Sequence, residues 1–369
     1  MQKNLPEKTA IFEIHLHHGA RMVPFAGYSM PVSYKDGIIA EHLHTRAKAG
    51  LFDVSHMGQI KISGLNLNNA IEKLIPIDLG SMGLNTMRYS FLMNESGGII
   101  DDLIISKIDN GYFLVVNASR KKYVINYLLN NIPKSINIEL LNNHSLFSLQ
   151  GPVAKNIISA FIPDLEKLFF LNCIFTTIKN INCFVSRSGY SGEDGFEISV
   201  DNKDALDLAD ILLNASEVHL VGLGARDSLR LEAGLCLYSH EIDENTTPLE
   251  ANLMWAIPKK RMREGGFIGY KKLLEQSQQA TNKTRIGLVM NDKMVARKNN
   301  EILDDQGKKI GAITSGTFSP SLNVPIGMGY INSTENLQDN PSVLIRKKKC
   351  EAKFSRLPFI QTRYYKYIS

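Results

Sequence analysis

Three short β-type segments that follow one another closely constrain the fold of this chain most strongly. They span residues 88–93, 99–105 and 112–117, and each is rich in β-branched or aromatic side chains. Turn-forming residues separate them at positions 94–98 and 109–111, where Gly, Asn and Asp gather. Because such short connections join antiparallel neighbours, the pattern predicts a three-stranded antiparallel meander.

Helical and strand-like segments alternate on both sides of this meander. Helical spacing of apolar residues covers positions 35–50, 68–74, a stretch from 121, 153–161, 203–213 and 223–234, whereas strand patterns cover 59–63, 136–141, 182–186 and 196–200. From residue 285 onward, short strands and turns are typical of a small β-barrel or sandwich. For 369 residues, at roughly 150 per domain, we therefore expect an α+β protein of two or three domains.

The composition excludes several classes of protein. Hydrophobic residues make up 44% and charged residues 21%, which argues against a disordered chain or a coiled coil. No stretch reaches the roughly 18 uncharged apolar residues of a membrane span. The net charge of +5 is too small for a nucleic-acid coat, although basic runs at residues 259–263 and 346–349 could attract an acidic partner. Four cysteines without a C-x-x-C pair favour a reducing compartment, and we predict a cytoplasmic protein.

Familiar cofactor motifs are absent or incomplete. Residues 222–227 begin like a dinucleotide-binding loop, but Asp227 stands where the third glycine belongs. The segment 189–193 misses the spacing of a serine-hydrolase elbow by one residue. The histidines at positions 15, 17, 18, 42 and 44 have no recognisable companion motif, so we predict no metal site.

Two acidic clusters are the best candidates for chemistry. In GGIIDD at residues 97–102, strand alternation is expected to send Asp101 and Asp102 to opposite faces, so that only one of them faces a given cleft. The cluster is either a pair of solvated acids or a site with Asp101 aimed into a pocket. The second cluster, SGYSGEDGFE at residues 188–197, is either a tight acidic turn or a binding loop.

Several motifs together resemble one enzyme family. They are LFDVSHM at residues 51–57, GGIIDDL at 97–103, GYSGEDG at 189–195, GARDSLRLEAG at 224–234, TTP at 246–248, FIG at 267–269 and TSGTFSPS at 314–321. In this order they resemble the aminomethyltransferase of the glycine cleavage system, the T-protein family. The resemblance covers about residues 8–365, and because it begins so near Met1, we expect no organelle presequence.

The resemblance implies a three-domain cloverleaf with antiparallel sheets and a C-terminal β-barrel around a central folate cavity. We predict a discontinuous folate-binding domain at residues 1–50 and 145–275, an inserted domain at 51–144 that carries Asp101, and a barrel at 285–369.

The implied activity is transfer of the aminomethyl carbon from the dihydrolipoyl arm of H-protein to tetrahydrofolate. Ammonia is released and 5,10-methylenetetrahydrofolate is formed, in glycine catabolism and one-carbon metabolism. H-protein is the direct partner, and the other glycine cleavage components are indirect ones. Two alternatives remain. The first is a related folate-dependent demethylase, which the intact residues 53–57 disfavour. The second is a non-enzymatic folate-binding iron–sulfur factor, whose hallmark cysteine is missing at 266–269.

The resemblance also implies individual roles. Asp101 matches the family's essential aspartate beside the reacting nitrogens of folate, and Glu197 matches the carboxylate that accepts hydrogen bonds from the pterin edge. Arg226 matches an arginine that binds folate or fixes that glutamate. Surfaces near the ring are implied at Tyr89, Tyr190, Tyr364 and Met57. Arg285 also matches a family arginine, which either contacts ligand or braces a domain interface.

Overall fold

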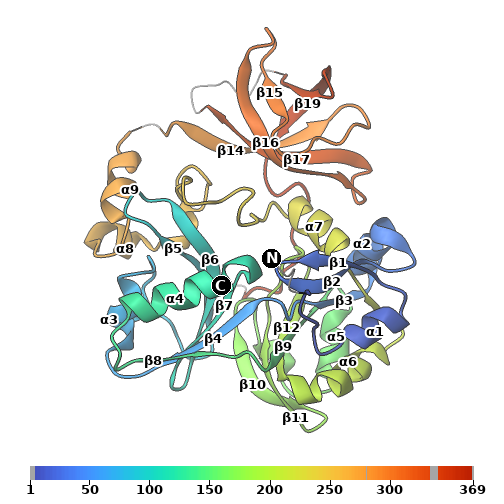
Figure 1. The fold of residues 1–369 in the computed structure, drawn as a ribbon, viewed down its shortest axis with the longest axis vertical. Helices are drawn as coiled ribbons and strands as arrows, with labels where there is room; N and C mark the ends of the chain where they lie inside the picture. The colour runs from blue at the N-terminus through green and yellow to red at the C-terminus, as the bar shows by residue number, and fades with distance from the viewer. Residues whose placement is uncertain (1–4, 280, 333–339, 368–369) are drawn as a thin grey trace.

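The protein is built from two large β-sheets, a β-barrel and a small two-stranded sheet, which the computed structural model describes over residues 5–279, 281–332 and 340–367. A six-stranded and a five-stranded sheet form the lower half of the molecule, and a closed six-stranded barrel stands above them (Figure 1). The two sheets meet through apolar side chains, since the rings of Phe113 and Phe184 lie 4.4 Å apart. The predicted α+β class, with antiparallel sheets and a C-terminal barrel, is confirmed.

The six-stranded sheet has the order β10-β11-β12-β9-β3-β13, and only its β3–β13 pair is parallel. Its strands are β3 (Ala49–Asp53), β9 (His144–Gln150), β10 (Cys173–Ile178), β11 (Ile181–Ser186), β12 (Gly195–Asp201) and β13 (Val218–Leu220). It is accompanied by the hairpin β1 (Arg21–Phe25) and β2 (Tyr28–Ser33), by helices α1 (Phe12–His17), α2 (Gly37–Ala47), α5 (Ala154–Ser159), α6 (Ala205–Leu213) and α7 (Leu223–Glu232), and by the 3₁₀ turns η2 (Leu165–Lys167) and η3 (Asn202–Asp204). Apolar residues from the strands and helices form one buried core.

The five-stranded sheet has the order β5-β6-β7-β4-β8, and every pair in it is antiparallel. Its elements are β4 (Gly58–Ser63), α3 (Leu67–Glu72), β5 (Met87–Met93), β6 (Ile99–Ile108), β7 (Gly111–Val116), η1 (Ala118–Arg120), α4 (Lys121–Asn131) and β8 (Asn137–Leu140). The predicted meander is thereby confirmed as β5, β6 and β7. Its core face packs against α3 and α4 through residues such as Leu103, Leu114 and Leu128.

The barrel has the order β14-β17-β16-β15-β18-β19, and β14 closes it by pairing with β19. Its strands are β14 (Lys283–Met290), β15 (Glu301–Leu303), β16 (Lys309–Ser319), β17 (Val324–Asn332), β18 (Ser342–Ile345) and β19 (Lys348–Ser355). Closure leaves no free sheet edge, and the interior is filled by apolar side chains.

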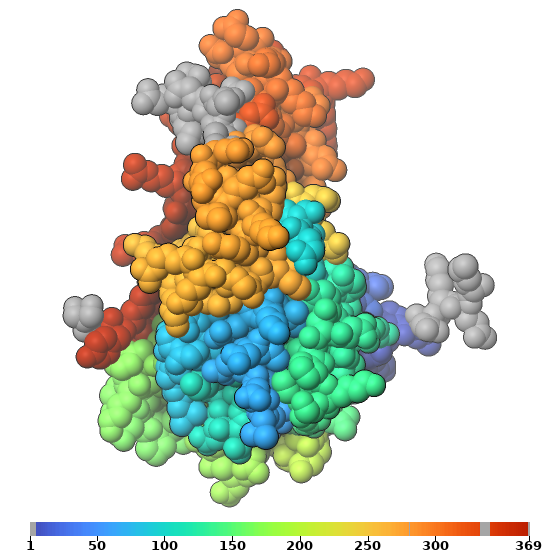
Figure 2. Space-filling model, turned by 90° about the vertical axis from the view of Figure 1, so that its left-hand side faces the viewer, coloured from blue at the N-terminus to red at the C-terminus, as the bar shows by residue number. Residues whose placement is uncertain are grey.

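The segment between α7 and β14 links the barrel to the five-stranded sheet. It carries η4 (Met254–Ala256), α8 (Lys259–Glu264) and α9 (Tyr270–Ser277), which lie on the surface between the barrel and that sheet (Figure 2). Its apolar residues pack against Phe91, Met93 and Ile99 at the ends of β5 and β6. Gly98 is required at this junction, because a Cβ there would lie 1.9 Å from the carbonyl oxygen of Glu244.

The domain boundaries expected from the sequence remain predictions, and residues 1–4, 280, 333–339 and 368–369 within them lie outside the described part of the chain. In that described part, no helix has the length and apolar character that crossing a bilayer requires.

Candidate functional site

Two adjacent aspartates at the start of β6 form the centre of the site. Asn117, which directly follows β7, donates from one amide nitrogen to Asp101 Oδ1 at 2.9 Å and to Asp102 Oδ1 at 2.6 Å. The expected alternation is kept, since Asp101 lies opposite Leu92 and Asp102 opposite Phe91, which belong to two different apolar clusters, yet one amide links both carboxylates. The reason is that Leu103 pairs with Val116, which puts Asn117 opposite Asp102, where its side chain reaches both carboxylates.

The electrostatics of this pair differ from those of surface acids. Burial and the negative charge of Asp102 raise the pKa of Asp101 to about 8, although Asn117 and Arg120 act in the opposite direction. Burial also raises the pKa of Asp102, which hydrogen bonds from Asn117 and Tyr89 lower again. Two carboxylates that share a site cannot both ionise easily, so the pair is expected to keep a proton near neutral pH.

Tyr89 and Trp255 form a stacked aromatic pair beside the aspartates. Tyr89 lies on β5 and donates its hydroxyl to Asp102 Oδ2 at 3.0 Å. The Trp255 ring lies 5.4 Å from the Tyr89 ring at an interplanar angle of 23°. Because Trp255 is 70% exposed, this stack leads from the surface to the carboxylate of Asp102.

A second charged group comes from β12, α7 and the turn between β11 and β12. Glu197 accepts a hydrogen bond from Ser188 at 3.2 Å, and the guanidinium of Arg226 lies 4.8 Å from the centre of the Tyr190 ring. Burial raises the pKa of Glu197, while Arg226 lowers it. Burial lowers the pKa of Arg226, and the charge of Glu197 raises it. Glu197 and Arg226 therefore stabilise each other's charged forms.

The two groups face one region of the molecule. The charges of Asp102 and Arg226 both act on the hydroxyl of Tyr190, whose pKa is raised chiefly by burial. Tyr190 donates that hydroxyl to the carbonyl oxygen of Cys236, which also fixes its ring. The side chains that retain partial solvent access here are those of Tyr89, Asp102, Asn117, Tyr190, Glu197 and Arg226. They form an accessible surface inside the fold rather than a packed core.

The other residues singled out by the resemblance lie around this surface. Met57 packs against the cluster that contains Ala225, the neighbour of Arg226. Tyr364 stacks on Phe170 with ring centres 4.1 Å apart, and none of its described contacts joins it to Asp102 or Arg226. We find no geometric reason to place Tyr364 against the same ring as Tyr190.

Arg285 on β14 has a different set of contacts. Its side chain donates to the carbonyl oxygens of Gly234 and Ala251, each at 2.9 Å, and it is 8% exposed. These carbonyls belong to the segment between α7 and the barrel. Of the two roles left open by the sequence, the geometry favours the brace between barrel and connecting segment.

The sequence did not point to three residues of the site, namely Asn117, Arg120 and Trp255. Asn117 is only the last residue of the strand expected at 112–117, and nothing in the local sequence marks it as a bridge. Trp255 could have been noticed, because it is the only tryptophan in the chain. Arg120 lowers the pKa of Asp101, and its guanidinium lies 5.1 Å from the centre of the Tyr238 ring.

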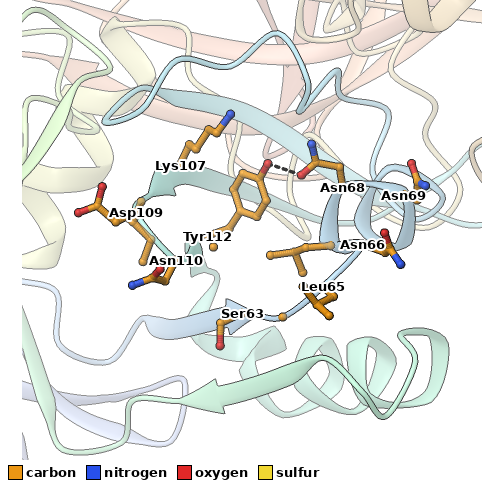
Figure 3. A pocket seen from close by; sticks show the side chains of 13 residues that line it. Ser63, Leu65, Asn66, Asn68, Asn69, Lys107, Asp109, Asn110 and Tyr112 are labelled. Carbon is orange, nitrogen blue, oxygen red and sulfur yellow. Dashed lines mark hydrogen bonds between the residues drawn. The ribbon is translucent and has the colours of Figure 1, made fainter.

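A separate pocket lies at the far end of β6. It has a volume of about 710 Å³ and is lined by the loop before α3 and the β6–β7 hairpin, where Tyr112 donates to Asn68 at 2.7 Å (Figure 3). Lys107 lies six residues after Asp101 on the same strand, or roughly 20 Å away. The pocket therefore does not belong to the aspartate site. Among the described residues, no group of three or more His, Cys, Asp or Glu side chains is arranged to hold a metal ion.

Comparisons with known proteins agree with one another. Two family models match the chain: "GCVT N-terminal domain" over residues 11–261 and "Glycine cleavage T-protein C-terminal barrel domain" over residues 283–361. The chain is 40% identical to "Aminomethyltransferase, mitochondrial" of Mesembryanthemum crystallinum, with 98% of this chain and 91% of that protein covered. It is also 40% identical to the "Probable aminomethyltransferase, mitochondrial" of Schizosaccharomyces pombe, covering 98% and 94%.

A solved structure extends the likeness to the whole fold. The glycine cleavage system aminomethyltransferase T from Bartonella henselae superposes with a TM-score of 0.93 at 37% identity. The match covers 98% of this chain and 100% of that one.

Proposed function

Because this chain belongs to the glycine cleavage T-protein family and is an aminomethyltransferase of that system, we propose that its co-substrate is tetrahydrofolate and its carbon donor the aminomethylated lipoyl arm of H-protein. The family assignment leaves the demethylase and iron–sulfur alternatives without support. The observation that carries the proposal is the accessible surface on which Asp102 and Glu197 stand at two ends, with Tyr190 and Arg226 between them.

The residues present fit a reduced folate. The pterin ring offers an amide N–H and an exocyclic amine side by side, and one carboxylate can accept both. Glu197 has that capacity, since Ser188 is the one side chain with a hydrogen bond to its carboxylate among the described residues. Arg226 would fix the carboxylate and keep it ionised. Tyr89 and Tyr190 would offer flat surfaces to the rings, with Met57 on the apolar side.

Asp101 is proposed as the acid–base group beside the reacting nitrogens. When bound, tetrahydrofolate supplies two nitrogens that take up the carbon. The chain must then remove protons from those nitrogens and stabilise the positive charge that develops on the carbon. A carboxylate pair with one proton near neutral pH can do both. Arg285 would act only as a positioning residue, through its bonds to the segment that carries Trp255.

Replacing Glu197 with alanine should weaken tetrahydrofolate binding by about 1.5–3 kcal/mol, the contribution of a hydrogen bond to a charged group. Isothermal titration calorimetry of the purified protein measures this directly. The matched control is Glu139→Ala, an exposed glutamate on β8, which should bind normally. Unchanged affinity in a folded Glu197→Ala protein would remove Glu197 from the folate site.

We also propose that the basic run at residues 259–263 helps to dock H-protein, which is typically acidic in this family. The run begins four residues after Trp255, on α8 at the surface shown in Figure 2. Lys259, Lys260 and Arg263 are exposed. Arg261 is not available for docking, because it is 8% exposed and donates to the carbonyl oxygen of Glu72 at 2.7 Å.

Neutralising Lys259, Lys260 and Arg263 together should raise the Michaelis constant for H-protein and leave folate affinity intact. Exposed charges are screened over about 8–10 Å at physiological salt, so the difference from the unmodified protein should shrink as ionic strength rises. The control is the same neutralisation of residues 346–349, which span the β18–β19 turn and the start of β19 on the barrel. If both variants bind H-protein normally at low salt, docking depends on other contacts.

The cytoplasmic location predicted from the sequence stays a proposal. All four cysteines are free and buried, as suits a reducing compartment. The relatives named above are mitochondrial by name. Fractionation of cells that express the full chain would decide between the two compartments.

A further inference from the structure

We propose that Asp101 and Asp102 act as one unit that holds a single proton, in which Asp101 carries the proton, Asp102 presents the ionised carboxylate, and Asn117 fixes both. The catalytic use of this unit rests on the proposed function. The shared proton itself is a property of the ligand-free protein and can be tested without substrate.

The contacts of Asn117 define the unit. One amide nitrogen donates to an oxygen of each aspartate and also lies 3.2 Å from the backbone oxygen of Asp102. The two carboxylate oxygens therefore cannot be further apart than the two donor distances added together. At such a separation, with Asp101 fully buried, ionising both groups is strongly unfavourable.

The two carboxylates are not equivalent, which decides where the proton resides. Asp102 accepts hydrogen bonds on both oxygens, from Asn117 and from Tyr89, and it is partly accessible to solvent. Asp101 is 0% exposed, and its Oδ2 has no hydrogen-bond partner in the described part of the protein. A buried oxygen without a donor is far costlier as a carboxylate than as a neutral acid. The negative charge is therefore assigned to Asp102.

The surrounding charged and titratable groups leave this assignment in place. Arg120 of η1 and Tyr238 of the connecting segment face Asp101, and Tyr89, Tyr190 and Cys236 face Asp102. Burial raises the pKa of each of these tyrosines and of the cysteine, so they remain neutral near pH 7. Arg120 is the one cation among them, and it already pairs with Glu244 at 2.7 Å.

A pair with one proton suits both halves of the transfer, which are the formation of the two carbon–nitrogen bonds to folate. In each half, one such bond forms and the attacking nitrogen gives up a proton. The electrons of the breaking bond stay on the leaving atom, and that atom gains a proton. The leaving atom is the amine nitrogen in one half and the lipoyl sulfur in the other. Asp102, the partly accessible member, would accept the first proton and deliver a proton to the leaving atom, while Asp101 keeps its own, so the pair ends each half with the proton count it began with.

The direct test follows the aspartate carboxyl groups of the ligand-free protein by carbon-13 NMR as pH is varied. We expect one carboxyl that stays protonated up to about pH 8 and is absent from the Asp101→Asn protein. In Asp102→Asn, loss of the neighbouring charge should lower the pKa of Asp101. In Asn117→Ala, the same protonated carboxyl should be present with a changed chemical shift. The control Asp207→Asn, an exposed residue on α6, should change nothing.

Two results would overturn the shared proton: both carboxyls ionised at pH 6–7, or an Asp101 titration that Asp102→Asn leaves unchanged. The pH dependence of kcat tests the catalytic use. Asp102→Asn should lower kcat by about 10²-fold or more and move the alkaline limb of the profile to lower pH. Normal kcat in that variant would reject the catalytic use alone. If the unmodified enzyme shows the shared proton but transfers no carbon to tetrahydrofolate, the proposed function fails instead.

Discussion

Asp101→Asn should lower the turnover number by about 10²- to 10⁴-fold while leaving tetrahydrofolate affinity nearly unchanged, the usual loss for a positioned acid–base group. Asparagine has the shape of the protonated acid and can still accept the hydrogen bond from Asn117, which donates to Oδ1 at 2.9 Å. It cannot share a proton with Asp102. The variant should therefore bind tetrahydrofolate normally but lose most of its turnover.

Single-turnover kinetics with aminomethylated H-protein, together with calorimetry for folate, separate these effects. Turnover close to that of the unmodified enzyme would remove Asp101 from the mechanism, and a loss confined to affinity would make it a binding residue. Asp207→Asn is again the matched control.

Stability gives a second, activity-independent readout of the same substitution. Burial and Asp102 raise the folded-state pKa of Asp101 to about 8, above the value of an aspartate in the unfolded chain. Between those two values the folded state binds the extra proton, so stability must fall as pH rises through this window. Asp101→Asn lacks this dependence. The melting temperature of Asp101→Asn, measured relative to that of the unmodified protein, should therefore rise between pH 5 and pH 8.

The sequence predicted the elements whose signals are local. The meander of β5, β6 and β7 was recognisable because turn residues separate its strands. In contrast, β3 (Ala49–Asp53) is buried at every position, so no alternation marks it as a strand. In the sequence, α8 (Lys259–Glu264) shows only as a basic run, because five of its six residues are charged and no local signal marks Arg261 as buried.

Contacts between distant segments account for what the sequence could not predict about the site. The bridge from Asn117 depends on the register between β6 and β7, and the Tyr89–Trp255 stack joins residues from different parts of the chain. The rejected dinucleotide loop has a packing explanation. A Cβ on Gly222 would lie 2.5 Å from the backbone of Val32, so this glycine lets α7 approach the β1–β2 hairpin.

A motif that identified the family also contains a structural centre. Glu232, the last residue of α7, is fully buried and accepts hydrogen bonds from His42 at 3.0 Å and Arg46 at 2.9 Å on α2. It also accepts them from Ser319 at 2.5 Å and from the Ser321 hydroxyl at 2.8 Å, at the end of β16 and just beyond it. One carboxylate thus joins two helices to the barrel.

Glu232→Gln should lower the free energy of unfolding by about 3–5 kcal/mol, the cost of breaking a buried ion pair on one side. The amide keeps the volume but loses the charge that Arg46 and His42 face, and its NH₂ group presents donors to other donors. Denaturant unfolding, followed by both circular dichroism and Trp255 fluorescence, measures the loss. Asp227→Asn is the matched control on the same helix, since that half-exposed residue pairs only with Arg230 among described contacts and should cost less than about 1 kcal/mol.

The pH dependence identifies the charge of Glu232 as the cause. Burial opposes its ionisation, but the hydrogen bond and charge of His42, with Ser319 and Arg46, bring its pKa down to about 2. A carboxylate with a depressed folded-state pKa stabilises the fold fully above its ordinary pKa and loses that contribution as pH falls toward the depressed value. The gap between the unmodified protein and Glu232→Gln should thus be constant near neutral pH and narrow below about pH 4. A gap that stays constant down to pH 2 would mean that the shape of the side chain, not its charge, joins α2, α7 and the barrel.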